Sequence, residues 1–271
     1  MKTLFVMNNS LSKDENGQYL KRRYQAAPGI MYMSSYLKDQ GYDVDTLNLN
    51  HYTDNKLEEI LSENHYDVVG LGGLFVFIED FKSIIQTTRK LSPTSLVLLG
   101  GQIATPDPDF AINSIKPDYL ILGEGEYVIR DFLNALQNDK DIKEVNGIGY
   151  LENGNLIKTP NAHVVDDLDA LPYPDYEGFE LNYMLDNFPL MDQSTVHPEN
   201  ARMVGIIASR GCPAKCTFCY LIAGDNVRLR SIDNIISEIN YLKSNYAVND
   251  INVLDDLFCT TKKKNAGILW E

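Results

Sequence analysis

Short apolar runs alternate with amphipathic segments along the first half of the chain. The apolar runs predict buried strands at residues 3–7, 43–49, 66–73, 95–101 and 119–126. Apolar residues spaced three and four apart predict helices at residues 29–41, 56–64 and 78–91, with one more helical stripe over 128–136. Because strands alternate with helices, we expect an α/β fold with a parallel, doubly wound sheet.

Glycines follow three of the predicted strands, at Gly72-Gly73, Gly100-Gly101 and Gly123-x-Gly125. In a doubly wound sheet the ligand lies beyond the carboxyl ends of the strands. A tight strand-to-helix turn explains any single pair, but three pairs at one edge favour a broad, flat ligand that approaches the backbone. The dinucleotide fingerprint GxGxxG is absent, which argues against nicotinamide and flavin dinucleotides.

The pattern changes after residue 138. Asn153-Gly154 is a strong signal for a β-hairpin, and Pro172 and Pro174 lie in an irregular acidic stretch. Further on, residues 203–209 predict a strand, Ser231 is expected to cap a helix, and residues 250–256 predict a second strand beside the first. We therefore divide the chain into an α/β domain (1–138), a connector with a hairpin and a proline-rich linker (139–200) and a third part (201–271).

Composition narrows the classes of protein. The formal net charge of −14 argues against a nucleic-acid partner, which would require a basic face. No apolar run approaches the roughly 20 residues that span a membrane, and the N-terminus does not resemble a signal peptide. We therefore expect a cytoplasmic protein with reduced thiols. The four histidines are scattered, and each is interpreted as a surface or loop residue: His51, His65, His163 and His197.

Three of the four cysteines lie within eight residues, in the pattern Cys212-x3-Cys216-x2-Cys219. A structural zinc site uses four ligands, and a [4Fe–4S] cluster has four irons that cysteine thiolates normally hold. Three thiols would leave one iron open to a substrate or cofactor. Two alternatives stay open on the residues alone: Cys259 could complete a zinc site, or it could be a small buried apolar residue.

The segments "PGIMYMSSYLKDQGYDVDTLNLN", "YDVVGLGG", "LVLLGGQIAT" and "DYLILGEGE" resemble the cobalamin-binding domain at the N-terminus of many radical S-adenosylmethionine (SAM) enzymes. The segments "DDLDALPYPDY" and "RGCPAKCTFCY" are similar to the linker and the cluster motif of that family. The resemblance implies a Rossmann-like cobalamin domain followed by the start of a partial (β/α) barrel. The Asp-x-His-x-x-Gly motif, whose histidine ligates cobalt in other cobalamin proteins, is missing.

The resemblance also implies the site residues. Cys212, Cys216 and Cys219 would hold a [4Fe–4S] cluster, with Cys259 as a free thiol. Phe218 would lie near the adenine of SAM, and Asp255 or Asp256 would bind its amino group. The implied cobalamin contacts are Gly72, Gly73, Leu74, Gly100, Gly101, Gln102, Thr105, Gly123 and Glu124.

The activity implied is reductive cleavage of SAM at the cluster to a 5′-deoxyadenosyl radical, followed by carbon methylation of an unidentified small molecule. An electron donor such as flavodoxin or ferredoxin would be the partner. About 68 residues follow Met203, so we expect the barrel to be incomplete and the chain to be a fragment that binds cobalamin better than it catalyses. The alternative is a non-catalytic cobalamin-binding protein with a structural metal site.

Overall fold

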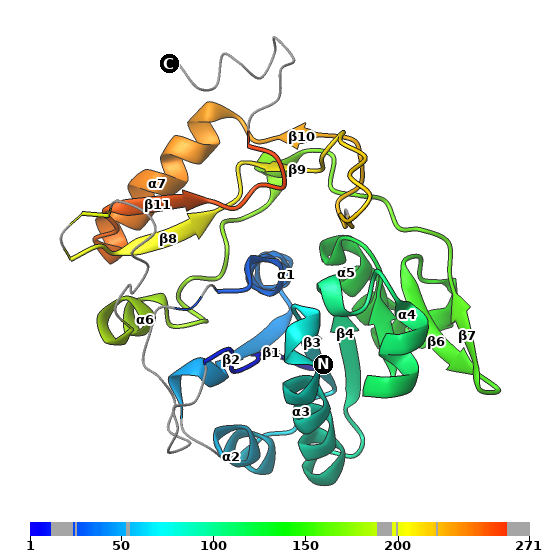
Figure 1. Cartoon of the computed structure of the whole chain (residues 1–271). Helices are drawn as coiled ribbons and strands as arrows, with labels where there is room; N and C mark the ends of the chain where they lie inside the picture. The colour runs from blue at the N-terminus through cyan, green and yellow to red at the C-terminus, as the bar shows by residue number, and fades with distance from the viewer. Residues whose placement is uncertain are drawn as a thin grey trace.

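The computed structural model describes residues 1–11, 24, 26–52, 55–188, 197–198, 200–220 and 222–258. Its largest element is a seven-stranded sheet (Figure 1). The strands are β1 (Lys2–Met7), β2 (Asp43–Asn48), β3 (Val68–Gly72), β4 (Leu96–Gly100), β5 (Tyr119–Ile121), β6 (Ile148–Glu152) and β7 (Asn155–Lys158). Their order across the sheet is β2-β1-β3-β4-β5-β6-β7.

The first five strands are parallel, as the alternating pattern predicted, and the sheet is then extended by an antiparallel hairpin. The hairpin turns at Asn153 and Gly154, whose φ angles of 52° and 80° are those of the two-residue turn that matches the twist of paired strands. Strand β6 pairs with β5, so the hairpin belongs to the main sheet. The sheet is therefore mixed and mostly parallel.

Helices cover both faces of the sheet because alternate residues of each strand point to opposite sides. Phe5 and Met7 pack with helices α1 (Pro28–Asp39) and α5 (Gly125–Gln137), whereas Leu4 and Val6 pack with α2 (Lys56–Glu63) and α3 (Ile78–Leu91). This doubly wound arrangement confirms the predicted fold class. Short helical segments complete the connections: η1 (Leu49–His51), η2 (Phe75–Phe77), η3 (Gly101–Ile103), α4 (Pro108–Phe110), η4 (Ala111–Ile115), η5 (Ile142–Glu144) and η6 (Leu168–Ala170).

The remaining elements form a second group; in Figure 1 most of it lies above α1 and α5, and α6 lies to the left of α1. They are α6 (Leu181–Asn187), β8 (Met203–Ile206), β9 (Ser209–Arg210), β10 (Arg228–Leu229), α7 (Ile232–Tyr246) and β11 (Asp250–Val253). Strand β11 pairs in parallel with β8, which confirms that the two predicted strands are neighbours. The Oγ of Ser231 accepts a hydrogen bond from the backbone N–H of Asn234 at 3.2 Å, which confirms the predicted cap of α7.

Two details differ from the sequence expectations. Helix α6 was not predicted. The strand expected over residues 203–209 breaks after β8, because the carboxylate of Asp255 accepts hydrogen bonds from the Ala208 N–H (2.7 Å) and the Ser209 hydroxyl (2.6 Å). These bonds replace strand pairing at that point. Within the described ranges, none of the helices has the length and apolar character needed to cross a membrane.

Candidate functional site

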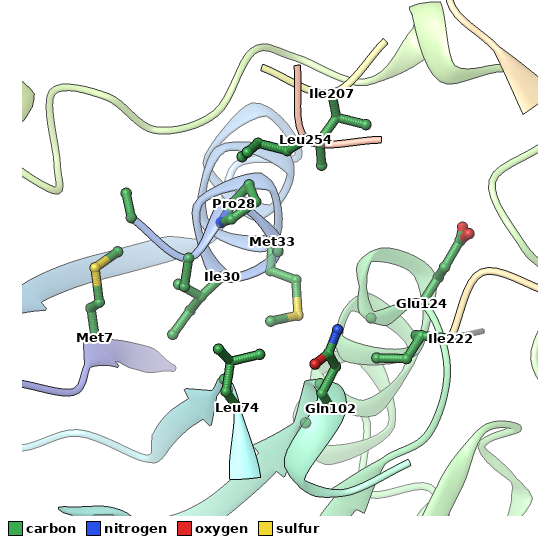
Figure 2. Close-up of a pocket in the computed structure, with 18 of the residues that line it drawn as sticks. Met7, Pro28, Ile30, Met33, Leu74, Gln102, Glu124, Ile207, Ile222 and Leu254 are labelled. Atoms are coloured by element: carbon green, nitrogen blue, oxygen red, sulfur yellow. The ribbon is translucent and has the colours of Figure 1, made fainter. Parts of the chain in front are cut away.

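A cavity of about 570 Å³ lies between the carboxyl edge of the main sheet and the second group of elements (Figure 2). Its volume is within the range of small-molecule and cofactor sites. The sheet side is lined by residues that follow β1, β3, β4 and β5 and by the start of α1. The opposite side is lined by Ile207, Ser209, Arg210, Tyr220, Ile222, Ala223, Leu254 and Asp256.

The strand order explains the position of this cavity. Strand β1 lies between β2 and β3 in the sheet. The connection after β1 runs toward β2, whereas the connection after β3 runs the other way, toward β4, which leaves a crevice between the ends of β1 and β3. The backbone carbonyl of Asn8, just beyond β1, accepts a hydrogen bond from the Asn50 side chain at 3.0 Å, which draws this loop toward β2. The cavity therefore lies where doubly wound sheets bind their ligands.

Glycine backbone forms the floor of the cavity. A Cβ on Gly101 would lie 3.1 Å from the backbone nitrogen of Gly73, and a Cβ on Gly73 would lie 3.0 Å from the Phe81 ring. Gly101 and Gly123 also have φ angles of +78° and +81°, which favour glycine. The close approach of these loops gives a flat floor, while the side chains of Leu74 and Gln102 reach into the space above it (Figure 2).

Eight of the nine residues proposed to contact cobalamin line this cavity: Gly72, Gly73, Leu74, Gly100, Gly101, Gln102, Gly123 and Glu124. Thr105 is not among the lining residues. Its hydroxyl accepts a hydrogen bond from the Gly123 N–H at 3.2 Å, and its backbone carbonyl accepts one from Tyr220 at 3.2 Å. Thr105 thus supports the rim. The sequence analysis did not predict the apolar wall of the cavity, which includes Met7, Ile30 and Met33. Their position near the end of β1 and the start of α1 was the one feature of the sequence that could have indicated this role.

The shape and chemistry of the cavity fit a broad, flat and largely apolar ring such as a corrin. The floor is backbone, and the walls carry aliphatic and thioether side chains. No histidine is found among the residues that line the cavity in the described part of the chain. These lining residues would therefore offer a bound corrin no imidazole ligand, which agrees with the missing Asp-x-His-x-x-Gly motif.

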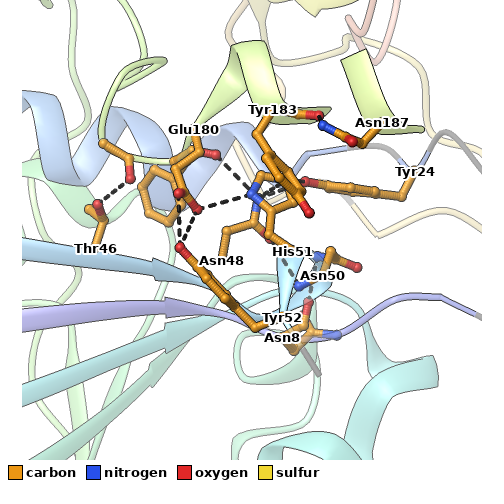
Figure 3. Close-up of polar contacts among 12 residues, drawn as sticks. Asn8, Tyr24, Thr46, Asn48, Asn50, His51, Tyr52, Glu180, Tyr183 and Asn187 are labelled. Carbon is orange, nitrogen blue, oxygen red and sulfur yellow. Dashed lines mark hydrogen bonds and ion pairs between the residues drawn. The ribbon is translucent and has the colours of Figure 1, made fainter. Parts of the chain in front are cut away.

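One end of the cavity is supported by a buried polar cluster around His51 (Figure 3). The Tyr24 ring lines the cavity, and its hydroxyl lies 2.6 Å from Nε2 of His51. The Asn48 amide donates to the same hydroxyl at 2.6 Å, and Nδ1 of His51 lies 3.0 Å from the Glu180 carboxylate. Tyr52 also donates to Glu180, at 2.8 Å. His51 does lie in a short connecting segment, η1, but it is not a surface residue, because its side chain is buried.

This geometry indicates the protonation state of His51. Burial lowers the pKa of His51 below its ordinary value, and the hydrogen bond and charge of Glu180 oppose that shift only in part. In the neutral ring, an Nδ1–H would donate to Glu180 and Nε2 would accept from the Tyr24 hydroxyl, which itself accepts from Asn48. Every donor then meets an acceptor, so we assign this tautomer.

The other end of the cavity is supported by buried charges. The Glu124 carboxylate accepts from Nη1 of Arg228 at 2.9 Å, from Nη2 of Arg228, from Nη1 of Arg210 at 3.3 Å and from the Val165 N–H at 3.1 Å. Nη2 of Arg210 donates to Glu126 at 2.6 Å. Burial would raise the pKa of Glu124, but the Arg228 hydrogen bond and the charges of both arginines outweigh it and hold that pKa below its ordinary value.

The cysteines lie on one loop, residues 211–227, which we call the cysteine loop; the structure describes all of it except residue 221. The β9–β10 pair closes its base, and the Cys212 N–H donates to the Gly224 carbonyl at 3.1 Å. Cys212 is buried, whereas Cys216 and Cys219 are exposed. Three thiols on one loop provide the type of donor atom that a [4Fe–4S] cluster requires. Within the described residues, however, no three potential ligands are gathered closely enough to hold a metal ion.

The residues proposed to bind SAM separate in the structure. Phe218 is 92% exposed and is not part of the cavity wall. Asp255 ties the chain after β11 to the chain after β8, as described above, whereas Asp256 lines the cavity. Burial, with a contribution from the Asp255 charge, raises the pKa of Asp256. Cys259, the possible fourth ligand, lies outside the described residues.

Known proteins share this architecture. Residues 24–133 match the family described as B12 binding domain. The chain is 25% identical over 247 residues to an uncharacterized methyltransferase of Pyrococcus horikoshii, covering 89% of this chain and 50% of that protein. It is 21% identical to the cytidylyl-2-hydroxyethylphosphonate methyltransferase of Streptomyces wedmorensis, covering 84% and 50%, respectively.

Two solved structures have the same fold. The radical SAM methyltransferase TsrM of Kitasatospora setae, solved with a tryptophan substrate and a SAM analogue, matches with a TM-score of 0.74 at 16% identity and covers 98% of this chain and 49% of TsrM. The cobalamin-dependent radical enzyme OxsB, solved with aqua-cobalamin, matches with a TM-score of 0.75 at 22% identity and covers 95% of this chain and 34% of OxsB.

Taken together, residues 24–133 match a B12-binding domain, and most of the chain is similar in sequence to the two methyltransferases and in fold to TsrM and OxsB. The chain spans about half the length of the curated methyltransferases named above.

Proposed function

We propose that this chain provides the cobalamin site and the cluster-binding loop of a radical SAM enzyme that methylates carbon in a small molecule. One observation carries the proposal. The glycine floor, which fits a corrin, and the residues that flank the cysteine loop line the same cavity. The names of the relatives favour methyl transfer, since three of them are named as methyltransferases, although others are named as cyclases of magnesium-protoporphyrin monomethyl ester.

Cobalamin, when bound, would supply methyl-group chemistry, and a [4Fe–4S] cluster would supply one electron to SAM. The chain's own residues would bind and orient these groups. The glycine backbone at the ends of β3 and β4 would receive the corrin, and the apolar walls would exclude water from the reacting atoms. Cys212, Cys216 and Cys219 would hold the cluster.

Asp256 would meet the ammonium group of SAM, because it lines the cavity, whereas Asp255 accepts hydrogen bonds from Ala208 and Ser209. A carboxylate and an ammonium form a strong hydrogen bond when both are charged. The binding of SAM would therefore lower the raised pKa of Asp256 and release a proton if that carboxyl group is neutral beforehand.

A titration of the purified chain with cobalamin, followed by absorbance, tests the first half of the proposal. Leu74 is 45% exposed at the cavity and Leu151 is 43% exposed on β6, so they form a matched pair. We expect Leu74→Trp to weaken binding at least tenfold, because the indole would fill the space above the floor, and Leu151→Trp to leave it unchanged. A wild-type chain that does not bind cobalamin would refute the assignment of the cavity.

Electron paramagnetic resonance of the anaerobically reconstituted, reduced chain tests the second half. We expect a [4Fe–4S]⁺ signal that changes when SAM is added and disappears in Cys216→Ser. Bound zinc without iron, with a requirement for Cys259, would instead support a non-catalytic cobalamin-binding protein with a structural metal site.

A further inference from the structure

We propose that Glu124 is a positioning residue that clamps both ends of the cysteine loop onto the start of α5 and so fixes that loop over the cavity. This inference deepens the proposed function and rests on it, because it assumes that the cysteine loop serves the cavity. The clamp itself lies in the apo protein, so it can be tested without any cofactor.

The clamp joins segments that are far apart in the sequence. Glu124 precedes α5, Arg210 lies two residues before Cys212, and Arg228 pairs with Arg210 across the β9–β10 ladder. One carboxylate therefore holds both strands at the base of the loop. Arg228 also donates to the backbone carbonyls of Val165, at 2.6 Å, and Ala223, at 3.2 Å, so it ties the connector and the loop to the same point.

Charge makes the clamp depend on Glu124. The side chains of Glu124, Glu126, Arg210 and Arg228 are between 3% and 11% exposed, and their two negative and two positive charges balance. Removal of one charge would leave an unbalanced charge in a buried site, which is strongly unfavourable. Without the carboxylate, two guanidinium groups would face each other across neighbouring strands. The loop base would then have to open to hydrate one of them.

The hydrogen-bonding capacity of Glu124 separates this role from that of a cobalamin contact. Its two oxygens accept four hydrogen bonds, three of them at Oε2. A carboxylate offers about four acceptor sites, so little capacity remains for an amide of a corrin. Glu124 lines the cavity, but its polar atoms are engaged by the protein.

The geometry next to the clamp explains how opening would be detected. Gly211 has a φ of +90°, and a Cβ on it would lie 2.4 Å from the Asn226 carbonyl, so the two ends of the loop are tightly packed. Cys212 is 7% exposed beside this contact, whereas Cys216 and Cys219 are exposed near the tip. The reactivity of Cys212 therefore reports on the loop base.

The experiment compares alkylation of the cysteines in the apo protein, located by peptide mass spectrometry, for wild type, Glu124→Gln and the surface control Glu152→Gln. We expect Cys212 in Glu124→Gln to react at least tenfold faster than in wild type, while Cys216 and Cys219 change less than twofold. Glu152→Gln should match wild type. Circular dichroism before labelling shows whether each variant is folded. If Glu124→Gln does not fold, the milder Arg228→Lys, which keeps the charge but loses the fork geometry, replaces it with the same expectation.

Cobalamin titration of the same variants separates the two roles of Glu124. A positioning role predicts faster Cys212 labelling in Glu124→Gln whether or not the affinity for cobalamin falls, because the loop that would move also lines the cavity. Slow Cys212 labelling with a tenfold loss of affinity would overturn the clamp and make Glu124 a cobalamin contact. If wild type does not bind cobalamin, the proposed function fails, whereas the labelling result still decides the clamp.

Discussion

The cavity is held by two buried polar clusters built on different principles. The cluster around His51 joins Tyr24, β2 and the connector through neutral hydrogen bonds and ends at the half-exposed Glu180. The cluster around Glu124 joins α5, the connector and the cysteine loop through full charges that are almost wholly buried. Both clusters connect sequence-distant segments to the same cavity.

The difference concerns what remains when one partner is lost. A neutral hydrogen bond that is lost leaves a polar atom without a partner, at a cost of about 1–3 kcal/mol. A buried charge pair that is broken leaves an uncompensated charge, at a cost of about 3–5 kcal/mol. The charged cluster therefore holds the segments that it joins more firmly, whereas the stability contributed by the His51 cluster can change with pH.

Loss of a charge from the Glu124 cluster should have the largest effect. We expect Arg228→Met to lower the free energy of unfolding by about 3–5 kcal/mol, because Glu124 loses two of its hydrogen bonds and its closest counter-charge. The measurement is urea unfolding followed by circular dichroism. As a control, Arg89→Met breaks the partly exposed pair with Asp118 and should cost less than about 1 kcal/mol. Equal losses in the two variants would contradict the contrast.

Loss of one hydroxyl from the His51 cluster should have an intermediate effect. Tyr24→Phe keeps the ring that lines the cavity but removes a bond to His51 and one from Asn48, so we expect a loss of about 1–3 kcal/mol by the same unfolding assay. Tyr183→Phe keeps the ring next to His51 and removes a hydroxyl from a side chain that is 42% exposed; it should change stability by less than about 0.5 kcal/mol. If Tyr24→Phe leaves the free energy of unfolding unchanged, the hydrogen bonds of the Tyr24 hydroxyl are not formed in solution.

The pH dependence should be the smallest effect and the most specific. Because the pKa of His51 is lowered on folding, the folded state binds fewer protons, and its stability is complete above the ordinary histidine pKa of about 6.5. We expect stability to fall as the pH drops below that value toward the lowered pKa, and His51→Gln to remove this part of the slope. The Glu124 cluster should not titrate in this window, since the pKa of Glu124 is lowered from an already acidic value. An unchanged slope in His51→Gln would assign the titration to other groups.

Much of the fold could be predicted because it depends on patterns within short segments of the sequence. Alternation of apolar residues fixed the strands and helices of the doubly wound sheet, and Asn153-Gly154 marked its hairpin. The glycines after β3 and β4 marked the cavity floor for the same reason, since the backbone conformation there is a local property. Helix α6 was missed because its short sequence, LNYMLDN, carries less than two turns of pattern and is stabilised by packing.

The polar clusters could not be predicted because their partners are distant in sequence. Glu124 was assigned to cobalamin from its place after a strand, yet its partner Arg228 lies 104 residues further along the chain. His51 was assigned to the surface or a loop, and η1 does place it in a short connecting segment. Its burial depends on Tyr24, which precedes it by 27 residues, and on Glu180, which follows it by 129 residues. Proximity of this kind arises only once the sheet has formed.

The backbone of Glu180 adds a consequence for motion. This residue has φ 56° and ψ 48°, a left-handed conformation that costs about 1–2 kcal/mol for a residue with a side chain. Its contacts to His51 and Tyr52 hold it there. If those contacts break, the release of this strain lowers the free energy of opening, so the connector at α6 should exchange its amide hydrogens sooner than the strands of the main sheet.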